Sequence, residues 1–281
     1  MPTISRRQFL YGSAMAVAVT ALDLEANPLG MPIGCQTFPV RDLIAKDFPG
    51  TLRQIAGGGF RMIEMCSPTG YEKYGFGSLA KMKAAEIRDM IKGARLGCES
   101  CHFQFRELKE SLDDRIAYAH ELGLKQMIVS TFALRHDAAM ADWMQAADDL
   151  NKLGEQTQKA GIQLGFHNHD FEFKEIDGVL IYDQLMKELD PKLVKMQFQV
   201  AVISLGYEAA SFLTKYPGRF ISLHLVDWSV AEKKIVPMGR GSIDWKKLFT
   251  AAKTGGIKNY FVEMDWELMQ ASVPYLRKLK V

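Results

Sequence analysis

The sequence predicts an α/β fold, a single-domain (β/α)8 TIM barrel over residues 31–281. Eight short apolar runs alternate with longer amphipathic segments along this stretch, and no linker or low-complexity segment interrupts them. Several amphipathic segments end in glycine just before the next run, as a helix C-cap does. Strands and helices that alternate over about 250 residues are typical of this barrel. A doubly wound open sheet is the alternative, but its glycine-rich phosphate loop is missing, because the glycines at 57–59 precede a strand.

Each apolar run has the length and composition of a β-strand. In chain order the runs are IGCQTF (33–38), MIEMC (62–66), CESCHF (98–103), QMIVST (126–131), QLGFHN (163–168), KMQFQV (195–200), FISLHL (220–225) and YFVEMD (260–265). The segments between them carry helical patterns, such as AEIRDMIKGARLG (85–97) and DWMQAADDLNKLGEQTQKAG (142–161). Asp244 directly precedes one such segment, and we expect it to cap that helix.

Composition and charge restrict the classes of ligand. The chain is 48% hydrophobic and 24% charged, values that are ordinary for a globular protein. Its 35 basic and 33 acidic residues leave a net charge of +2, which gives no strong field to hold nucleic acid or an anionic membrane surface. We therefore expect a small neutral or weakly charged ligand, and no nucleic-acid partner. The oligomeric state stays open.

Residues 1–26 have the pattern of an export signal. Arg6 and Arg7, within SRRQFL (5–10), precede an apolar stretch of small residues from Tyr11 to Leu22. This layout is typical of a secretory signal, and the arginine pair indicates the twin-arginine (Tat) type. The apolar stretch is too short for a membrane span, which needs about 20 residues, so we expect no stable membrane insertion. We therefore expect the Tat export machinery as a partner and a periplasmic location.

Polar side chains recur on the last four predicted strands. Successive side chains of a strand point to opposite faces, so His167 and His169 share one face and Phe166 lies on the other. The same alternation gives three further strands a polar residue opposite apolar neighbours: Gln199, His224 and Glu263. The histidine pair alone has an alternative interpretation. It could be the polar end of a strand, with both histidines hydrogen-bonded to neighbouring residues.

These four strands predict a metal site at the mouth of the barrel. Polar groups at the carboxyl ends of barrel strands are where such enzymes keep their chemistry. His167, Gln199, His224 and Glu263 should therefore meet there. Two imidazoles, an amide oxygen and a carboxylate suit one divalent metal ion, with Mn²⁺ preferred and Co²⁺ or Zn²⁺ as alternatives.

Several motifs resemble those of one family. The motifs are IGCQTFPVRD (33–42), GFHNHDFEF (165–173), the segment 191–228 that ends in FISLHLVDW, GRGSIDW (239–245) and NYFVEMDW (259–266). Together they resemble the xylose isomerase-like TIM barrels of the AP endonuclease 2-type superfamily, in the branch of sugar phosphate isomerases/epimerases. The resemblance covers residue 31 to the end. It implies one divalent metal at the mouth with one ligand on each of strands five to eight, which maps onto His167, Gln199, His224 and Glu263. The branch also includes lyases and hydratases of 3-keto-glycosides.

Two positions depart from the family pattern. Gln199 stands where the sixth strand usually has Asp, and His224-Leu225-Val226-Asp227 stands where the seventh usually has His-x-Lys-Asp. Both changes remove charge. A neutral amide oxygen ligates a metal more weakly than a carboxylate, so we expect weakened metal binding. Val226 cannot donate a hydrogen bond to a sugar oxygen.

The resemblance and the polar mouth together predict an isomerase or epimerase that acts on a sugar or keto-sugar. A proton next to a carbonyl is removed, and an ene-diolate forms with help from the metal. Glu263 is the candidate ligand and base, and His169 is the other candidate acid/base, because an imidazole titrates near neutrality. Export favours an unphosphorylated or oxidised sugar. The alternatives are a lyase or hydratase on 3-keto-glycosides, and an exported sugar-binding barrel that lost its reaction.

Further side chains are candidates for substrate contact. Glu64 and His102 point inward by strand parity, with plain polar satisfaction as the alternative role. Glu172 could orient a histidine or be solvated. Trp228 follows the seventh strand and could stack on a sugar ring, although a packed loop tryptophan is the alternative. Arg240 lies in the long loop after the seventh strand and could reach a substrate oxygen.

Overall fold

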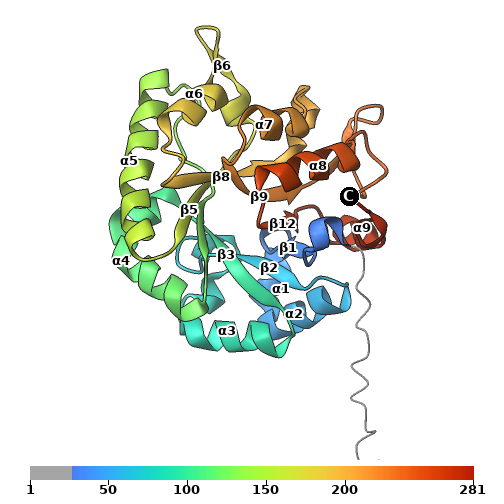
Figure 1. Cartoon of the computed structure of the whole chain (residues 1–281). Coiled ribbons are helices and arrows are strands. Elements are labelled where there is room, and N and C mark those ends of the chain that lie inside the picture. Colours follow the sequence, from blue (N-terminus) through green and yellow to red (C-terminus); the bar gives the residue numbers. More distant parts are fainter. Residues whose placement is uncertain (1–26) are drawn as a thin grey trace, which may run out of the picture.

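The computed structural model describes residues 27–281, which form a closed barrel of eight parallel strands surrounded by helices (Figure 1). The strands are β1 (Gly34–Gln36), β2 (Met62–Cys66), β3 (Gly97–Phe103), β4 (Gln126–Val129), β5 (Gln163–His167), β8 (Val194–Gln199), β9 (Phe220–Leu225) and β12 (Asn259–Val262). Each overlaps one predicted run, and β1 closes the barrel by pairing with both β2 and β12. The predicted fold class is confirmed. The export signal predicted for residues 1–26 lies outside the described residues.

Helices follow the strands and cover the barrel from outside. They are α1 (Arg41–Lys46), α2 (Phe48–Gly57), α3 (Ala84–Gly93), α4 (Phe105–Leu122), α5 (Met140–Lys159), α6 (Ile181–Glu188), α7 (Ala209–Lys215), α8 (Trp245–Gly255) and α9 (Trp266–Lys278). Gly123 ends α4 with a φ of +91°, the left-handed conformation that glycine adopts without strain. Asp244 caps α8 as predicted, because its side chain accepts the Lys247 N–H. Within residues 27–281, the structure contains no helix that combines the length and apolarity of a membrane span.

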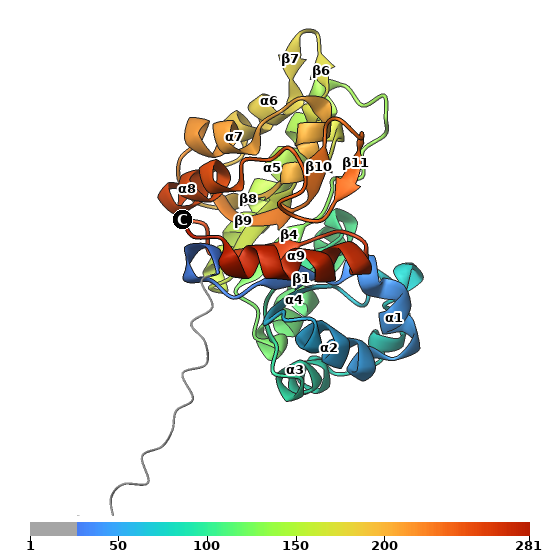
Figure 2. The same cartoon turned by 90° about the vertical axis from the view of Figure 1, so that its right-hand side faces the viewer.

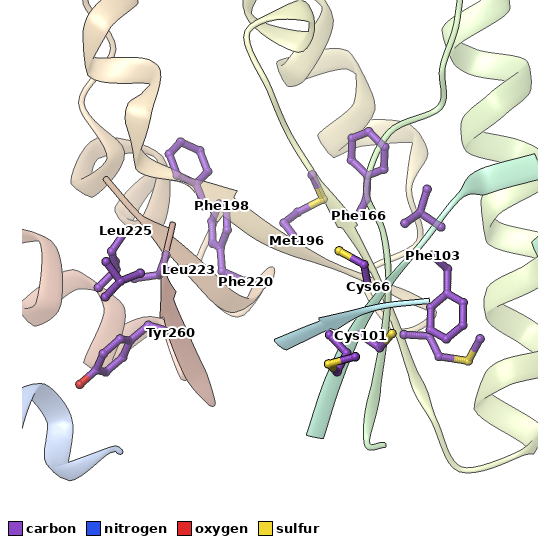
Figure 3. Close-up of a cluster of buried hydrophobic side chains, with 14 of the residues drawn as sticks. Cys66, Cys101, Phe103, Phe166, Met196, Phe198, Phe220, Leu223, Leu225 and Tyr260 are labelled. Carbon is purple, nitrogen blue, oxygen red and sulfur yellow. The ribbon is translucent and has the colours of Figure 1, made fainter. Parts of the chain in front are cut away.

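Strand side chains divide into an outer apolar layer and an inner polar one. Phe166, Phe198, Leu223 and Tyr260 are fully buried between the barrel and its helices, and Figure 3 shows part of this layer. The opposite face of the strands carries buried polar residues: Gln36, Glu64, Ser100, His102, His167, Gln197, Ser222 and His224. Most barrels fill this space with branched apolar residues. The polar interior therefore needs a network of hydrogen bonds.

Two hairpins follow strands of the barrel, and Figure 2 labels the strands of both. The first, β6 (Glu175–Ile176) with β7 (Val179–Leu180), follows β5, and the second, β10 (Asp227–Ser229) with β11 (Lys234–Val236), follows β9. Buried Asp227 holds the second hairpin and the loop after it, because its Oδ2 accepts the Gly239 N–H at 2.8 Å and the Trp245 Nε1–H at 3.0 Å. Both hairpins rise beside the carboxyl ends of the strands.

Candidate active site

A cavity of about 590 Å³ opens at the carboxyl ends of the barrel strands. His102, His167, His169 and Glu263 form a polar part of its wall. Its aromatic part consists of Phe38, Tyr71, Tyr74, Phe105 and Phe132. The volume lies within the range of about 300–1,000 Å³ that is usual for small-molecule sites. The predicted mouth is therefore a real cavity with convergent polar groups.

The carboxylate of Glu64 on β2 is the centre of the network beneath the cavity. Its Oε1 accepts hydrogen bonds from Ser100 Oγ at 2.6 Å and from Gln197 Nε2 at 2.8 Å. Its Oε2 accepts one from Gln36 Nε2 and lies 2.5 Å from His224 Nε2 and 3.1 Å from His102 Nε2. Burial alone would raise the pKa of Glu64, but the charges and hydrogen bonds of the two histidines lower this pKa well below its ordinary value.

Glu64 fixes the orientation of His224. Because Nε2 of His224 faces Glu64, its Nδ1 faces the mouth, where it lies 2.8 Å from Oε2 of Glu263. A histidine whose far nitrogen is held by a buried carboxylate is the usual arrangement behind a metal ligand. Burial disfavours the charged ring, yet the two carboxylates raise the pKa of His224 to about 10.

Gln199 lies against the same carboxylate. Its Nε2 donates to Glu263 Oε2 at 2.7 Å, and its Oε1 accepts the Ala201 N–H at 3.2 Å. The ends of β8, β9 and β12 thus bring three of the four predicted ligands, Gln199, His224 and Glu263, to one point. In this arrangement the Gln199 nitrogen donates to Glu263, and the Gln199 oxygen is already engaged by the Ala201 N–H.

Three imidazoles gather beside this point. The ring centroid of His167 lies 4.4 Å from that of His224 and 5.1 Å from that of His102. One ring nitrogen from each of these three buried residues lies within 4.8 Å of the others, a spacing that allows them to hold one metal ion. His102, expected either to contact substrate or to be a satisfied polar group of the barrel, is thus part of the cluster.

Unpartnered nitrogens show that the cluster fits a divalent metal. In residues 27–281, the buried Nδ1 atoms of His167 and His169 have no hydrogen-bond partner. Burial and the neighbouring histidines lower the pKa of His167 well below its ordinary value, which keeps its ring neutral. A neutral imidazole with a free lone pair is a good ligand for Zn²⁺ and similar ions. An orphaned polar atom costs free energy unless a ligand satisfies it.

The other residues expected to contact substrate lie off this cavity, except His102. Glu64 is wholly buried beneath it, and Glu172 is also buried and accepts the His169 N–H at 2.7 Å. Glu172 is therefore neither solvated nor bonded to a histidine ring. Trp228 is half-buried in the β10–β11 hairpin, and Arg240 is exposed in the turn that follows β11, so neither lines the mouth.

Sequence reasoning missed the aromatic wall. Phe38 follows β1, Phe105 begins the helix after β3, and Phe132 follows β4, so all three occupy the carboxyl-end position that was considered only for the later strands. Tyr71 and Tyr74 come from the long connection after β2. Attention to the second and third residues after every strand would have found the first three.

Fold and site together define a class of protein: a (β/α)8 barrel whose mouth holds a histidine and carboxylate cluster suited to a divalent metal. Residues 52–279 match the family described as Xylose isomerase-like TIM barrel. The chain belongs to this family, as its motifs predicted.

Individual relatives are distant. An inosose dehydratase from Geobacillus thermodenitrificans is 26% identical over 190 residues, which cover 56% of this chain and 63% of that protein. The match thus spans slightly less than two thirds of that relative's length. Among solved structures, a sugar phosphate isomerase/epimerase from Parabacteroides distasonis has a TM-score of 0.73 at 24% identity, and the match covers 88% of this chain and 93% of the other. A xylose isomerase-like TIM barrel protein from Mycobacterium smegmatis in complex with magnesium has a TM-score of 0.65 at 15% identity, with 90% and 97% covered.

Proposed function

We propose that this chain is a metal-dependent enzyme that removes a proton next to a carbonyl of a sugar or keto-sugar, and so isomerises or epimerises it. The observation that carries the proposal is the cluster at the mouth, where His167, His169 and Glu263 face one cavity and two buried imidazole nitrogens lack partners. The sugar-active relatives and neighbours support the substrate class.

The chain offers a donor set for one divalent metal. His167 and His224 of the three-histidine group would hold it together with Glu263, whose Oε2 lies against His224, and His102 and Gln199 lie beside them. When bound, such a metal supplies the positive charge that polarises a carbonyl. The magnesium complex of the Mycobacterium smegmatis barrel supports a metal of this kind.

His169 is the candidate base. It lines the cavity, its Nδ1 is unpartnered, and burial lowers the pKa of its imidazole below the ordinary value. The ring is therefore neutral at neutral pH and can accept a carbon-bound proton. Glu172 fixes the backbone of His169 through the hydrogen bond to its N–H. Glu263 is engaged by His224 and Gln199, an arrangement that favours a ligand role for this carboxylate.

A second candidate outcome is elimination of water from the same carbanion. Its specific support is that the matched curated relatives are inosose dehydratases. Isomerisation, epimerisation and elimination share the first proton abstraction, and they differ in where the electron pair goes next. A sugar-binding barrel without turnover remains the rival from another class, and Gln199 and Val226 are the residues that favour it.

The test follows proton abstraction itself. The chain is incubated with Mn²⁺ and a panel of keto-sugars in D2O, and loss of the C–H signal next to the carbonyl is followed by NMR. We expect exchange in the parent, and loss of at least about 100-fold in His169→Ala with metal content retained. Metal content is measured by inductively coupled plasma mass spectrometry. Equal exchange rates in parent and His169→Ala would remove His169 from the mechanism, and binding without exchange would favour the non-catalytic barrel.

We also propose that the protein is exported through the Tat system, on the pattern around Arg6 and Arg7. A fusion of the first 26 residues to a reporter that is active only after Tat export tests this. Export should be lost in the Arg6→Lys, Arg7→Lys double variant, and export that persists there would contradict the assignment.

A further inference from the structure

His102 on β3 belongs to the histidine cluster, although the family resemblance implies ligands only on strands five to eight. His102 is buried and lines the cavity at the mouth. Its ring is stacked on that of His224, with the ring centroids 5.1 Å apart and the ring planes at 10°. One ring nitrogen of His102 lies within 4.8 Å of one nitrogen each of His167 and His224. The structure therefore adds a third imidazole to the ligand set that the resemblance implies.

The hydrogen bonds of Gln197 determine which nitrogen of His102 is free. The amide nitrogen of Gln197 donates to Glu64 Oε1 at 2.8 Å, and an ionised carboxylate can only accept. The amide oxygen of Gln197 then lies 2.6 Å from His102 Nε2, and because this oxygen can only accept, Nε2 must carry the hydrogen. In the neutral ring Nδ1 is therefore the nitrogen with the lone pair. The described part of the chain gives this Nδ1 no hydrogen-bond partner.

Glu64 holds His102 in the way that it holds His224. Its Oε2 lies 3.1 Å from Nε2 of His102 and 2.5 Å from Nε2 of His224. A histidine that ligates a metal usually donates its far ring nitrogen to a carboxylate or a carbonyl, which orients the ring and raises the basicity of the ligating nitrogen. One buried carboxylate thus prepares two rings. The third ring, that of His167, has a buried Nδ1 that lacks a partner within residues 27–281.

Gln199 does not supply a donor atom in this arrangement. Its oxygen accepts the Ala201 N–H at 3.2 Å, and its nitrogen donates to Glu263 at 2.7 Å. An amide nitrogen has no lone pair to offer a cation. The donor set is therefore richer in nitrogen than the sequence predicted. It consists of the imidazoles of His102, His167 and His224 and the carboxylate of Glu263.

We propose that the mouth is a three-histidine metal site in which His102 is a ligand, so that it selects a nitrogen-preferring metal such as Zn²⁺ over Mn²⁺ and Mg²⁺. Imidazole suits zinc and its neighbours among the transition metals, whereas carboxylate, carbonyl and water oxygens suit magnesium and manganese. The inference rests on the proposed metal-dependent function. It adds a ligand from a strand outside the implied set and names the class of metal.

Calorimetric titration of the purified chain with Zn²⁺ and with Mn²⁺ tests the site. Most sites already bind Zn²⁺ more tightly than Mn²⁺, so the decisive quantity is the ratio of the two dissociation constants in parent and variant. We expect His102→Gln to weaken Zn²⁺ binding at least about 100-fold and Mn²⁺ binding less than about tenfold. The matched control is His120→Gln, which removes an exposed imidazole at the end of α4 and should leave both constants unchanged.

A measurement on the parent covers the case in which His102→Gln does not fold. Long-range ¹H–¹⁵N NMR correlations of the ¹⁵N-labelled chain report which imidazole nitrogens bind Zn²⁺, because a ring nitrogen shifts strongly when it ligates a metal. We expect Nδ1 of His102 to shift on addition of equimolar Zn²⁺, together with one nitrogen each of His167 and His224. The ring nitrogens of His120 should keep their positions.

The outcomes separate this inference from the proposed function. If both nitrogens of His102 keep their metal-free shifts while His167 and His224 respond, His102 is not a ligand; the inference is refuted and the metal-dependent function stands. An equal ratio of Zn²⁺ to Mn²⁺ affinity in the parent and in a folded His102→Gln variant also refutes the inference. If neither metal binds to the parent, the inference falls together with the proposed function.

Discussion

At the scale of single residues, Gln199 decides the charge of the mouth. Its amide donates to Glu263. The family resemblance implies a carboxylate at this position, and by that comparison the cluster carries one negative charge fewer. The same amide keeps Glu263 paired when no metal is bound. Gln199 thus favours a stable metal-free site over a tight metal site.

Restoring that charge should strengthen metal binding. We expect Gln199→Asp to lower the dissociation constant for Mn²⁺ by at least about tenfold, because a carboxylate oxygen is a stronger ligand for a hard cation than an amide oxygen. Gln199→Asn is the matched control, since it has the size of Asp without the charge. Calorimetric titration measures all three. Equal affinities in the Asp and Asn variants would show that position 199 does not contact the ion.

Glu172 makes stability depend on pH. Burial raises the pKa of this carboxyl from an ordinary 4.5 to about 7 in the folded chain. At a pH between 4.5 and about 7, Glu172 holds a proton in the folded state that it has lost in the unfolded state. The contribution of Glu172 to the free energy of unfolding is therefore complete below pH 4.5 and is lost as the pH rises through 7. The difference of about 2.5 pKa units corresponds to about 3 kcal/mol.

Glu172→Gln should remove this dependence, because an amide does not titrate. We expect the free energy of unfolding of the variant, minus that of the parent, to rise by about 3 kcal/mol as the pH goes from 5 to 8. Urea denaturation at four pH values in this range measures the change. A difference between variant and parent that stays constant with pH would contradict the assignment.

At the scale of elements, two helices of the second half of the chain offer a matched test of capping. Asp244 accepts the Lys247 N–H at the start of α8, whereas Asp265 precedes α9 without a side-chain cap bond. We expect Asp244→Ala to cost about 1 kcal/mol of stability and Asp265→Ala clearly less. Thermal and urea denaturation measure both. Equal losses would mean that the cap bond at Asp244 contributes little.

Elements were predictable where local patterns determine them. The eight runs of the barrel and the cap at Asp244 follow from alternation, length and turn chemistry, which a single sequence displays. The β6–β7 hairpin was not predicted, because four strand residues in all around a tight turn leave no periodicity to detect. The β10–β11 hairpin was not predicted either. It is held by buried Asp227, which accepts hydrogen bonds from Gly239 and Trp245, 12 and 18 residues further along the chain.

At the scale of the whole molecule, the metal should act as a ligand of the folded state. If it binds only the native cluster, a concentration of 100 times the dissociation constant adds about 2.7 kcal/mol to the free energy of unfolding. For a chain of this size we expect the melting temperature to rise by about 5–10 °C with Mn²⁺ and to return with a chelator. His224→Ala should lose the response to Mn²⁺. A metal response that persists in this variant would place the ion elsewhere.

The candidate site was predictable in part. Strand parity selected His167, His224 and Glu263 correctly as neighbours at one mouth, because barrel topology fixes which ends meet. Parity could not tell that the Gln199 amide would turn its nitrogen toward Glu263, that Glu172 would be buried, or that Trp228 and Arg240 would lie off the cavity. These outcomes depend on side-chain orientation and on loop paths, which only the packed structure determines.

The buried carboxylate of Glu64 has a consequence for how the barrel can be divided. Its hydrogen-bond partners Gln197 and His224 lie 133 and 160 residues further along the chain. A fragment that ended before β8 would leave this charge in the barrel interior without those donors, at a cost of several kcal/mol. Neither half of this barrel is then a self-sufficient folding unit, and assembly should be all-or-none across the two halves. Such a barrel is a poor starting point for a stable half-barrel, however regular its eight repeats look.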